Sequence, residues 1–248
     1  MVDYADQIRA VRVNLSAERY NGVASNTAVN SLGYVDTLSG VEWVKTGAGD
    51  DWLIGSAANN RLEGGLGNDW LRGGAGSDTL WGGLGVDTAD YSDADQGVTI
   101  VLRGDGIAQA GTAISVGSTG SDDLYSIENI LGSSHADHIT GDTAANWIDG
   151  GAGADTILSG DGDDTVVFDA ADASVDGGAG TDTLMVRDEV VDLAIFTAGG
   201  KFKNFEVISC NPDIVNIGSS WTFRVKCIER AVGIIGMKRM PGIYPFIF

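Results

Sequence analysis

Residues 46–90 read TGAGDDWLI, GSAANNRLE, GGLGNDWLR, GGAGSDTLW and GGLGVDTAD, which are five nine-residue units without a gap. Residues 132–185 continue the phase with GSSHADHIT, GDTAANWID, GGAGADTIL, SGDGDDTVV, FDAADASVD and GGAGTDTLM. Self-similarity at a short fixed period indicates a solenoid. A flexible Gly/Asp-rich linker is the competing interpretation, but a linker has no reason to keep one apolar position in phase through eleven units.

The eighth position of every unit is apolar, whereas glycines gather at the first four positions. Glycines permit the unusual backbone angles of a tight turn, and the last three residues can extend as a short strand with one side chain inward. Two units would then form one coil, and stacked coils would build two parallel sheets around a thin core. The expected fold is an all-β parallel β-roll (a β-helix or solenoid) in two blocks with inserted antiparallel hairpins. The position-eight residues are Leu53, Leu62, Leu71, Leu80, Ala89, Ile139, Ile148, Ile157, Val166, Val175 and Leu184.

The composition is strongly acidic, with 35 Asp and Glu against 15 Lys and Arg and a net charge of -20. Such a chain is a poor partner for nucleic acid. Its self-repulsion would oppose compaction unless cations neutralise it, and a divalent metal is the natural candidate. The last 50 residues differ, because they hold seven basic side chains and only three acids.

The units resemble the haemolysin-type calcium-binding repeats of the RTX family over residues 46–90 and 132–185. The resemblance implies calcium ions between the turns of successive coils, held by backbone carbonyls and by the position-six side chain. Oxygen ligands in a flexible geometry are what calcium prefers. The implied side-chain ligands are Asp51, Asn60, Asp69, Asp78, Asp87, Asp137, Asn146, Asp155, Asp164 and Asp182. The implied turn backbone lies at Gly47, Gly49, Gly65, Gly67, Gly74, Gly76, Gly83, Gly85, Gly151, Gly153, Gly160, Gly162, Gly178 and Gly180.

Units two apart are expected to share an ion, which gives about six sites. The pairs are Asp51 with Asp69, Asn60 with Asp78, Asp69 with Asp87, Asp137 with Asp155, Asn146 with Asp164, and Asp164 with Asp182. Three units depart from the pattern: GSAANNRLE, GDTAANWID and FDAADASVD. In the last of these Ala173 offers no ligand, so a site between Asp155 and Ala173 is in doubt.

The chain divides into five segments: a hairpin or capping segment (1–45), the first roll block (46–90), an inserted hairpin or capping segment (91–131), the second block (132–185) and a C-terminal capping or secretion-related segment (186–248). The inserted segments repeat, since VDYADQIRAVRVNL parallels ADYSDADQGVTIVL and DTLSGVEWV parallels DDLYSIENI. Tyr4 matches Tyr91, and Glu42 matches Glu128, with Glu206 at the same place in a third, shorter version. We expect the inserted hairpin to cap the roll, and Met1 to lie within a longer repeat array.

The start, MVDYADQIRAV, lacks the pattern of a conventional signal peptide, and the longest apolar run near the end is too short to span a membrane. RTX proteins commonly use a C-terminal signal for type I secretion, so the resemblance implies a secreted, extracellular protein. The tail WTFRVKCIERAVGIIGMKRMPGIYPFIF does not clearly match such a signal, and a capping element or out-of-frame sequence explains it equally well. The sequence leaves open whether Cys210 and Cys227 pair and how the chain oligomerises.

No catalytic motif is present: HExxH, GxSxG, GxGxxG and the P-loop are all missing, so the chain is not expected to be an enzyme. His135 and His138 are more consistent with exposed polar residues than with a transition-metal site. Trp52, Trp70, Trp81 and Trp147 could stack on sugars, although such residues more often pack between coils. Three functions remain: a calcium-triggered folding and secretion module, the accessory region of a secreted protease, lipase or polysaccharide-modifying enzyme, and an adhesin segment that binds glycans or cells.

Overall fold

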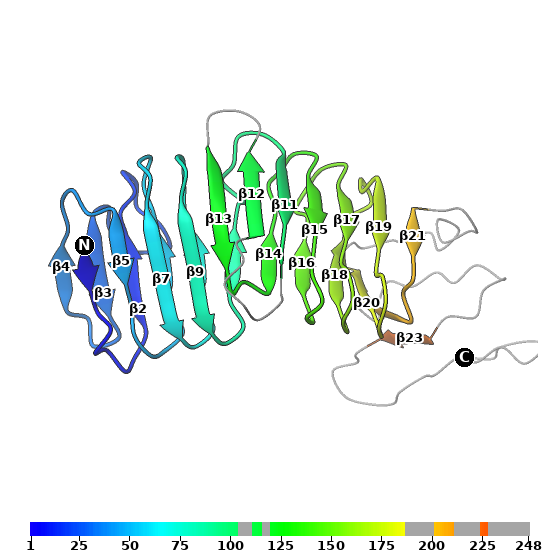
Figure 1. Ribbon diagram of the computed structural model, residues 1–248, viewed down its shortest axis with the longest axis horizontal. Helices are drawn as coiled ribbons and strands as arrows, with labels where there is room; N and C mark the ends of the chain where they lie inside the picture. The colour runs from blue at the N-terminus through cyan, green and yellow to red at the C-terminus, as the bar shows by residue number, and fades with distance from the viewer. Residues whose placement is uncertain (104–110, 116–119, 187–200, 211–223, 228–248) are drawn as a thin grey trace, which may run out of the picture.

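The computed structural model describes residues 1–103, 111–115, 120–186, 201–210 and 224–227, and these residues form strands and turns but no helix. The strands assemble into an 11-stranded sheet (sheet A) and a 12-stranded sheet (sheet B), both mostly parallel. Figure 1 shows the strands side by side along the long axis of the molecule. The expected all-β parallel β-roll with antiparallel hairpins is therefore confirmed.

The order of strands in each sheet alternates along the sequence, as a roll requires. Sheet A runs β1 (Val2–Asp3), β5 (Trp43–Lys45), β7 (Arg61–Leu66), β9 (Thr79–Leu84), β13 (Ser121–Tyr125), β12 (Gly111–Ser115), β11 (Val98–Val101), β15 (His138–Thr140), β17 (Thr156–Leu158), β19 (Ser174–Asp176) and β21 (Phe202–Lys203). Sheet B runs β23 (Arg224–Cys227), β22 (Val207–Cys210), β20 (Thr183–Val186), β18 (Thr165–Phe168), β16 (Trp147–Asp149), β14 (Asn129–Leu131), β10 (Thr88–Asp90), β8 (Trp70–Arg72), β6 (Trp52–Ile54), β2 (Val11–Asn14), β3 (Thr27–Asn30) and β4 (Val35–Thr37).

Two nonapeptide units form one coil, with one strand in each sheet. Leu53 in β6 pairs with Leu71 in β8 within sheet B, and Leu62 in β7 pairs with Leu80 in β9 within sheet A. The position-eight side chains of all eleven units are at most 1% exposed and form the core between the sheets. The predicted core of the repeat region is therefore confirmed, because each coil hides its single aliphatic side chain against the next.

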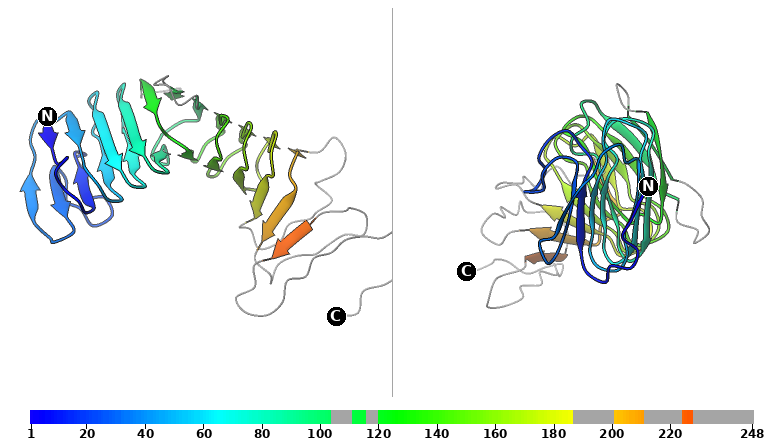
Figure 2. Two further views of the ribbon diagram at one scale, coloured as in Figure 1. Left: turned by 60° about the horizontal axis from the view of Figure 1, so that its bottom comes forward. Right: turned by 90° about the vertical axis from the view of Figure 1, so that its left-hand side faces the viewer.

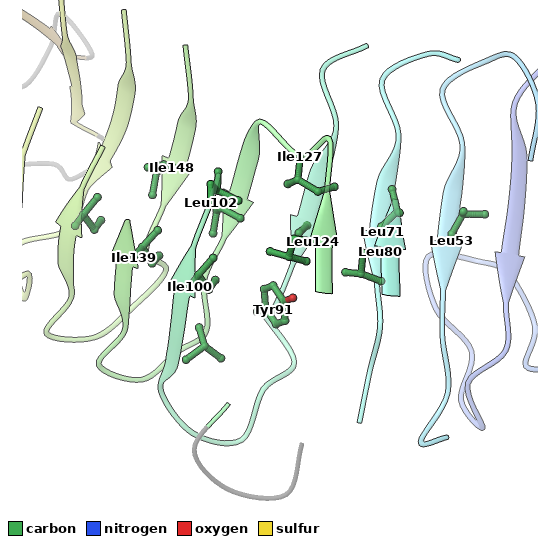
Figure 3. Close-up of a cluster of buried hydrophobic side chains, with 14 of the residues drawn as sticks. Leu53, Leu71, Leu80, Tyr91, Ile100, Leu102, Leu124, Ile127, Ile139 and Ile148 are labelled. Carbon is green, nitrogen blue, oxygen red and sulfur yellow. The ribbon is translucent and has the colours of Figure 1, made fainter. Parts of the chain in front are cut away.

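The two blocks belong to one continuous roll. In sheet B, β10 pairs directly with β14 in parallel, with Ala89 opposite Ile130. In sheet A, β12 runs antiparallel between β13 and β11, which themselves pair in parallel with β9 and β15. Figure 3 shows that the core continues through this junction, from Leu53 through Leu124 and Ile100 to Ile148. The strands described within residues 91–131 thus join the two blocks inside the sheets, between β9 and β15 in sheet A and between β10 and β16 in sheet B.

The N-terminal segment forms one end of the roll (Figure 1). The antiparallel strands β2, β3 and β4 lie at the edge of sheet B, and β1 lies at the edge of sheet A. At the other end, the register of the parallel strands β22 and β23 places Cys210 opposite Cys227. No helix among the described residues is long and apolar enough to cross a membrane. Most of the tail, which we expected to cap the roll or to direct secretion, lies outside the described residues.

Figure 2 shows the same roll from two further directions. In its left view the stacked coils follow a bent path, and the bend lies near the junction between the two blocks. In its right view, along the roll, the coils largely superimpose. The turns of successive coils therefore lie above one another, which is the arrangement on which the candidate metal sites depend.

Candidate metal sites in the turns

The turns stack so closely that several of their glycine positions have no room for a side chain. Gly83 has a φ of 119°, and a Cβ built on it would collide with the carbonyl oxygen of Gly65 one coil away. Of the fourteen predicted turn glycines, all except Gly47 have a positive φ. This close stacking brings the carbonyl oxygens of one turn against the backbone of the next, where a cation could reach several of them.

The position-six side chains form ladders that run from coil to coil. Within each ladder, a backbone N–H donates to Oδ1 of the acid in the next coil, for example from Asp51 to Asp69 at 2.8 Å and from Asp69 to Asp87 at 2.7 Å. The same bond joins Asn60 to Asp78, Asp137 to Asp155, Asn146 to Asp164, and Asp164 to Asp182. The structure thus brings together all six pairs that the repeat spacing predicts, although the assignment of these residues as metal ligands stays a prediction.

The second carboxylate oxygen of most of these acids is buried without a hydrogen-bond donor. It lies against the glycine that opens the same unit, so that a Cβ at Gly64, Gly73 or Gly82 would collide with Oδ2 of Asp69, Asp78 or Asp87 respectively. An unpaired buried carboxylate oxygen is costly. The described atoms in this condition are Oδ2 of Asp51, Asp69, Asp78, Asp87, Asp155, Asp164 and Asp182 and Oδ1 of Asp172.

Burial disfavours the charged form of these acids. Desolvation raises the pKa of Asp69, Asp78 and Asp87 to about 7, against an ordinary value of 3.8, and the backbone N–H donors offset only part of that effect. Burial also raises the pKa of Asp155 and Asp182 to about 6. A nearby cation would reverse this preference, because an opposite charge favours the anion.

Three position-six residues satisfy their oxygens differently. Asn60 and Asn146 accept a backbone N–H through Oδ1, and their Nδ2 groups donate to the carbonyls of Glu42 and Glu128 one coil earlier. Asp137 accepts bonds from the backbone N–H and the hydroxyl of Ser133. These three residues therefore carry no orphaned oxygen in the described structure.

The ladders end on acids that the nonapeptide pattern does not contain. Asp122 accepts the N–H of Asp78 at 2.8 Å, Glu128 accepts that of Asp87 at 2.9 Å, and Glu206 accepts that of Asp182 at 2.9 Å. Sequence reasoning missed these contacts, although the recurrence of Glu at 42, 128 and 206 was a usable signal.

The degenerate unit FDAADASVD provides a fourth unexpected acid. Asp172, one residue before Ala173, is 1% exposed and faces Asp155, and burial raises its pKa to about 7. The doubtful position therefore holds a carboxylate after all, displaced by one residue. No feature of the repeat phase predicts this displacement.

The donor set fits calcium better than a transition metal. No group of three or more His, Cys, Asp or Glu side chains that could hold a metal occurs in the described part of the chain. An ion between turns would therefore take one or two carboxylate oxygens and fill its remaining positions with main-chain carbonyls, which is oxygen-only coordination of the kind calcium accepts. His135 and His138 are both exposed.

The tryptophans of the first block pack between coils. Trp52 stacks on Trp70 with ring centroids 5.4 Å apart, and Trp81 stacks on Tyr125 at 5.1 Å. The Trp70 indole also donates to Asp90. These contacts favour the packing role over sugar stacking at Trp52, Trp70 and Trp81.

A family model of the RTX calcium-binding nonapeptide repeat, which describes four copies of the unit, matches residues 36–69, 54–89 and 131–166. No curated protein matches the chain. The matched segments include both ladders of the first block and the start of those in the second. Residues 36–89 and 131–166 are thus RTX calcium-binding nonapeptide repeats.

Proposed function

We propose that the turn ladders bind about six calcium ions and that calcium drives the folding of the roll, as a module of an exported bacterial protein. The repeats bind calcium as a structural element and are not catalytic. The observation that carries the finer proposal is the set of buried carboxylate oxygens that no donor reaches. Without a cation these anions oppose folding, and with one they become ligands.

Charge accounts for the unfolded state at low calcium. The chain carries a net charge of -20, and its acids recur in every coil, so the repeats repel one another until a counter-ion binds. At free calcium ten times the dissociation constant, each site adds about 1.4 kcal/mol, and six sites add about 8 kcal/mol. That is comparable with the stability of a whole domain, so calcium alone could switch the fold.

Export fits this switch. RTX repeats typically occur in exported bacterial proteins. A chain that stays unfolded in a calcium-poor cytosol and folds in millimolar calcium outside would cross a secretion apparatus as an extended polypeptide. The switch thus gives the acidic repeats a role in the secretion of the chain.

Calcium stoichiometry, measured by equilibrium dialysis against radioactive calcium, tests the sites. Asp69 belongs to two predicted pairs and Asp51 to one, so Asp69→Ala should remove about two ions of the six and Asp51→Ala about one. Asp6→Ala is the matched control, because Asp6 is exposed and outside the ladders. Far-ultraviolet circular dichroism at saturating calcium checks that each variant remains folded. Equal stoichiometry in all four proteins would contradict the assignment.

A further inference from the structure

The middle of the roll and its N-terminal end are two copies of one structure with the sheets exchanged. Strands β1 to β4 correspond to β10, β11, β12 and β13, and β5 corresponds to β14. The register is the same in both copies: Val13 lies opposite Ala28 in β2 and β3, as Ile100 lies opposite Ala113 in β11 and β12. Both copies then continue in parallel into the following block, through β2 with β6 and through β11 with β15.

Side-chain hydrogen bonds repeat along with the strands. The Tyr4 hydroxyl donates to Asp36 Oδ2 at 2.9 Å, as that of Tyr91 donates to Asp122 Oδ2 at 3.1 Å. Asp3 Oδ1 accepts the N–H two residues later, as Asp90 Oδ1 does. The two copies therefore hold equivalent carboxylates in equivalent orientations.

In the middle copy the remaining oxygens of these carboxylates bind the last coil of the first block. Asp122 Oδ1 accepts the N–H of Asp78, and Asp90 Oδ2 accepts the Trp70 indole and the Arg72 guanidinium. Main-chain pairing accompanies them, since β13 lies parallel to β9 and the N–H of Asp123 donates to the carbonyl of Asp78. The junction between the blocks is thus held by the pairing of β13 with β9 and of β10 with β8, and by the hydrogen bonds that Asp122 and Asp90 accept.

At the N-terminal end the same oxygens face solvent. Among the described residues nothing donates to Asp36 Oδ1, to Asp3 Oδ2 or to the Glu42 carboxylate, and all three residues are exposed. By contrast, Asp122 is only 6% exposed. The edge strand β4 carries neither Lys nor Pro, the residues that commonly protect an open edge. The exposed large apolar residues of this end are Met1, Ile8, Leu32, Tyr34, Val35 and Trp43.

We propose that this N-terminal face, formed by the edges of β1 and β4 with Asp3, Asp36 and Glu42, is a docking surface for the last coil of another nonapeptide β-roll block. The occupant would pair two strands with β4 and β1, as β9 and β8 pair with β13 and β10. Its position-six N–H groups would donate to Asp36 and Glu42. This inference rests on strand pairing and is separate from the calcium proposal.

A fusion protein tests the surface. A second copy of residues 46–87 is placed directly before Met1. Met1 then follows Asp87 of the added copy, as Thr88 follows Asp87 in the middle of the roll. In saturating calcium, hydrogen exchange read by mass spectrometry should slow at least about tenfold at Val35–Thr37. The reason is that the Thr37 N–H would donate to a carbonyl of the added block, as the Asp123 N–H donates to the carbonyl of Asp78. The matched control inserts one Gly at the junction, since a one-residue slip turns every strand side chain to the wrong face.

Variants at the acceptor complete the test. Asp36→Ala also removes the acceptor of the Tyr4 hydroxyl, so the fusion that carries it is compared with the original chain that carries the same substitution. In that comparison Asp36→Ala should abolish the added protection, and Asp36→Asn, which keeps the accepting Oδ1, should restore it. The inference would be overturned if the rate of hydrogen exchange at β4 were the same in the in-register fusion, the shifted fusion and the original chain. A failed calcium switch would appear separately, as a lack of response of the original chain to calcium.

Discussion

The two oxygens of a position-six carboxylate have different roles. Oδ1 of Asp69 accepts the backbone N–H of Asp51 and so registers one coil on the next, whereas Oδ2 is buried without a donor. The first role stabilises the stack in any solvent, and the second requires a cation. The same side chain therefore both sets the coil spacing and makes the fold dependent on metal.

Asp69→Asn separates these roles. An amide at this position can satisfy both of its polar atoms, because at Asn60 and Asn146 Oδ1 accepts an N–H of the same turn and Nδ2 donates to a carbonyl one coil earlier. It can therefore still join two coils, but without a charge. In chelator the variant should be more stable than the original chain by about 1 kcal/mol, because a buried unpaired anion is gone. In calcium the order should reverse. Because the metal-free chain is unfolded, its stability in chelator is measured as the concentration of trimethylamine N-oxide that folds it, and the stability in calcium is measured by urea unfolding. A variant that needs more of this osmolyte than the original chain would contradict the prediction.

Protons should partly replace calcium. Because folding raises the pKa of Asp69, Asp78 and Asp87 from 3.8 to about 7, the metal-free folded chain binds protons more tightly than the unfolded chain. In chelator the free energy of unfolding should therefore rise as the pH falls from 7 toward 4, and this gain should disappear as the pH rises through 7.

In calcium the trend should be opposite, since protons compete for the ligand oxygens. Folding by trimethylamine N-oxide in chelator and thermal unfolding in calcium, each measured at several pH values, distinguish the two regimes. The control is Asp6→Ala, which removes an exposed carboxylate and should leave both trends unchanged. A stability in chelator that decreases steadily below pH 7 would show that the buried carboxylates do not titrate in this way.

At the scale of the strand, the last three residues of each unit contribute a single core side chain, that of position eight. No second side chain of the unit can therefore replace it in the core. Leu80 in β9 is fully buried, whereas Leu84 at the end of the same strand is 71% exposed. Leu80→Ala should lower the free energy of unfolding in calcium by about 3 kcal/mol, and Leu84→Ala should change it by less than about 0.5 kcal/mol. Equal losses in urea unfolding would mean that position eight does not form the core.

The sequence predicts these strands well where the period holds, because burial of position eight and the turn chemistry point to the same structure. It does not predict that β11, β12 and β13 enter sheet A between β9 and β15. That placement depends on the parallel pairing of β13 with β9 and of β11 with β15, which lie far apart in the chain. Nor does it predict Asp122, Glu128 and Asp172 as partners of the ladder acids. These residues lie outside the position-six phase, and only the stacked coils bring them into place.

At the scale of the whole molecule, the core is thin and the net charge is strongly negative. The stability of the roll therefore depends on the contacts between neighbouring coils. Each coil touches only its neighbours, so an ion that orders one turn should favour folding of the next coil, and the roll should fold cooperatively as ions bind. The continuous pairing of β10 with β14 links the two blocks, and folding of one should assist the other. Calcium thus stabilises the roll along its whole length as well as in individual turns.

A calcium titration of the chelator-treated chain, followed by far-ultraviolet circular dichroism with magnesium as the control, tests the central claim most directly. The predicted result is a cooperative gain of β signal with calcium and little change with magnesium, which demands more regular octahedral geometry and retains its water. A chain that already shows the full β signal in chelator, and does not respond to calcium, would contradict the account.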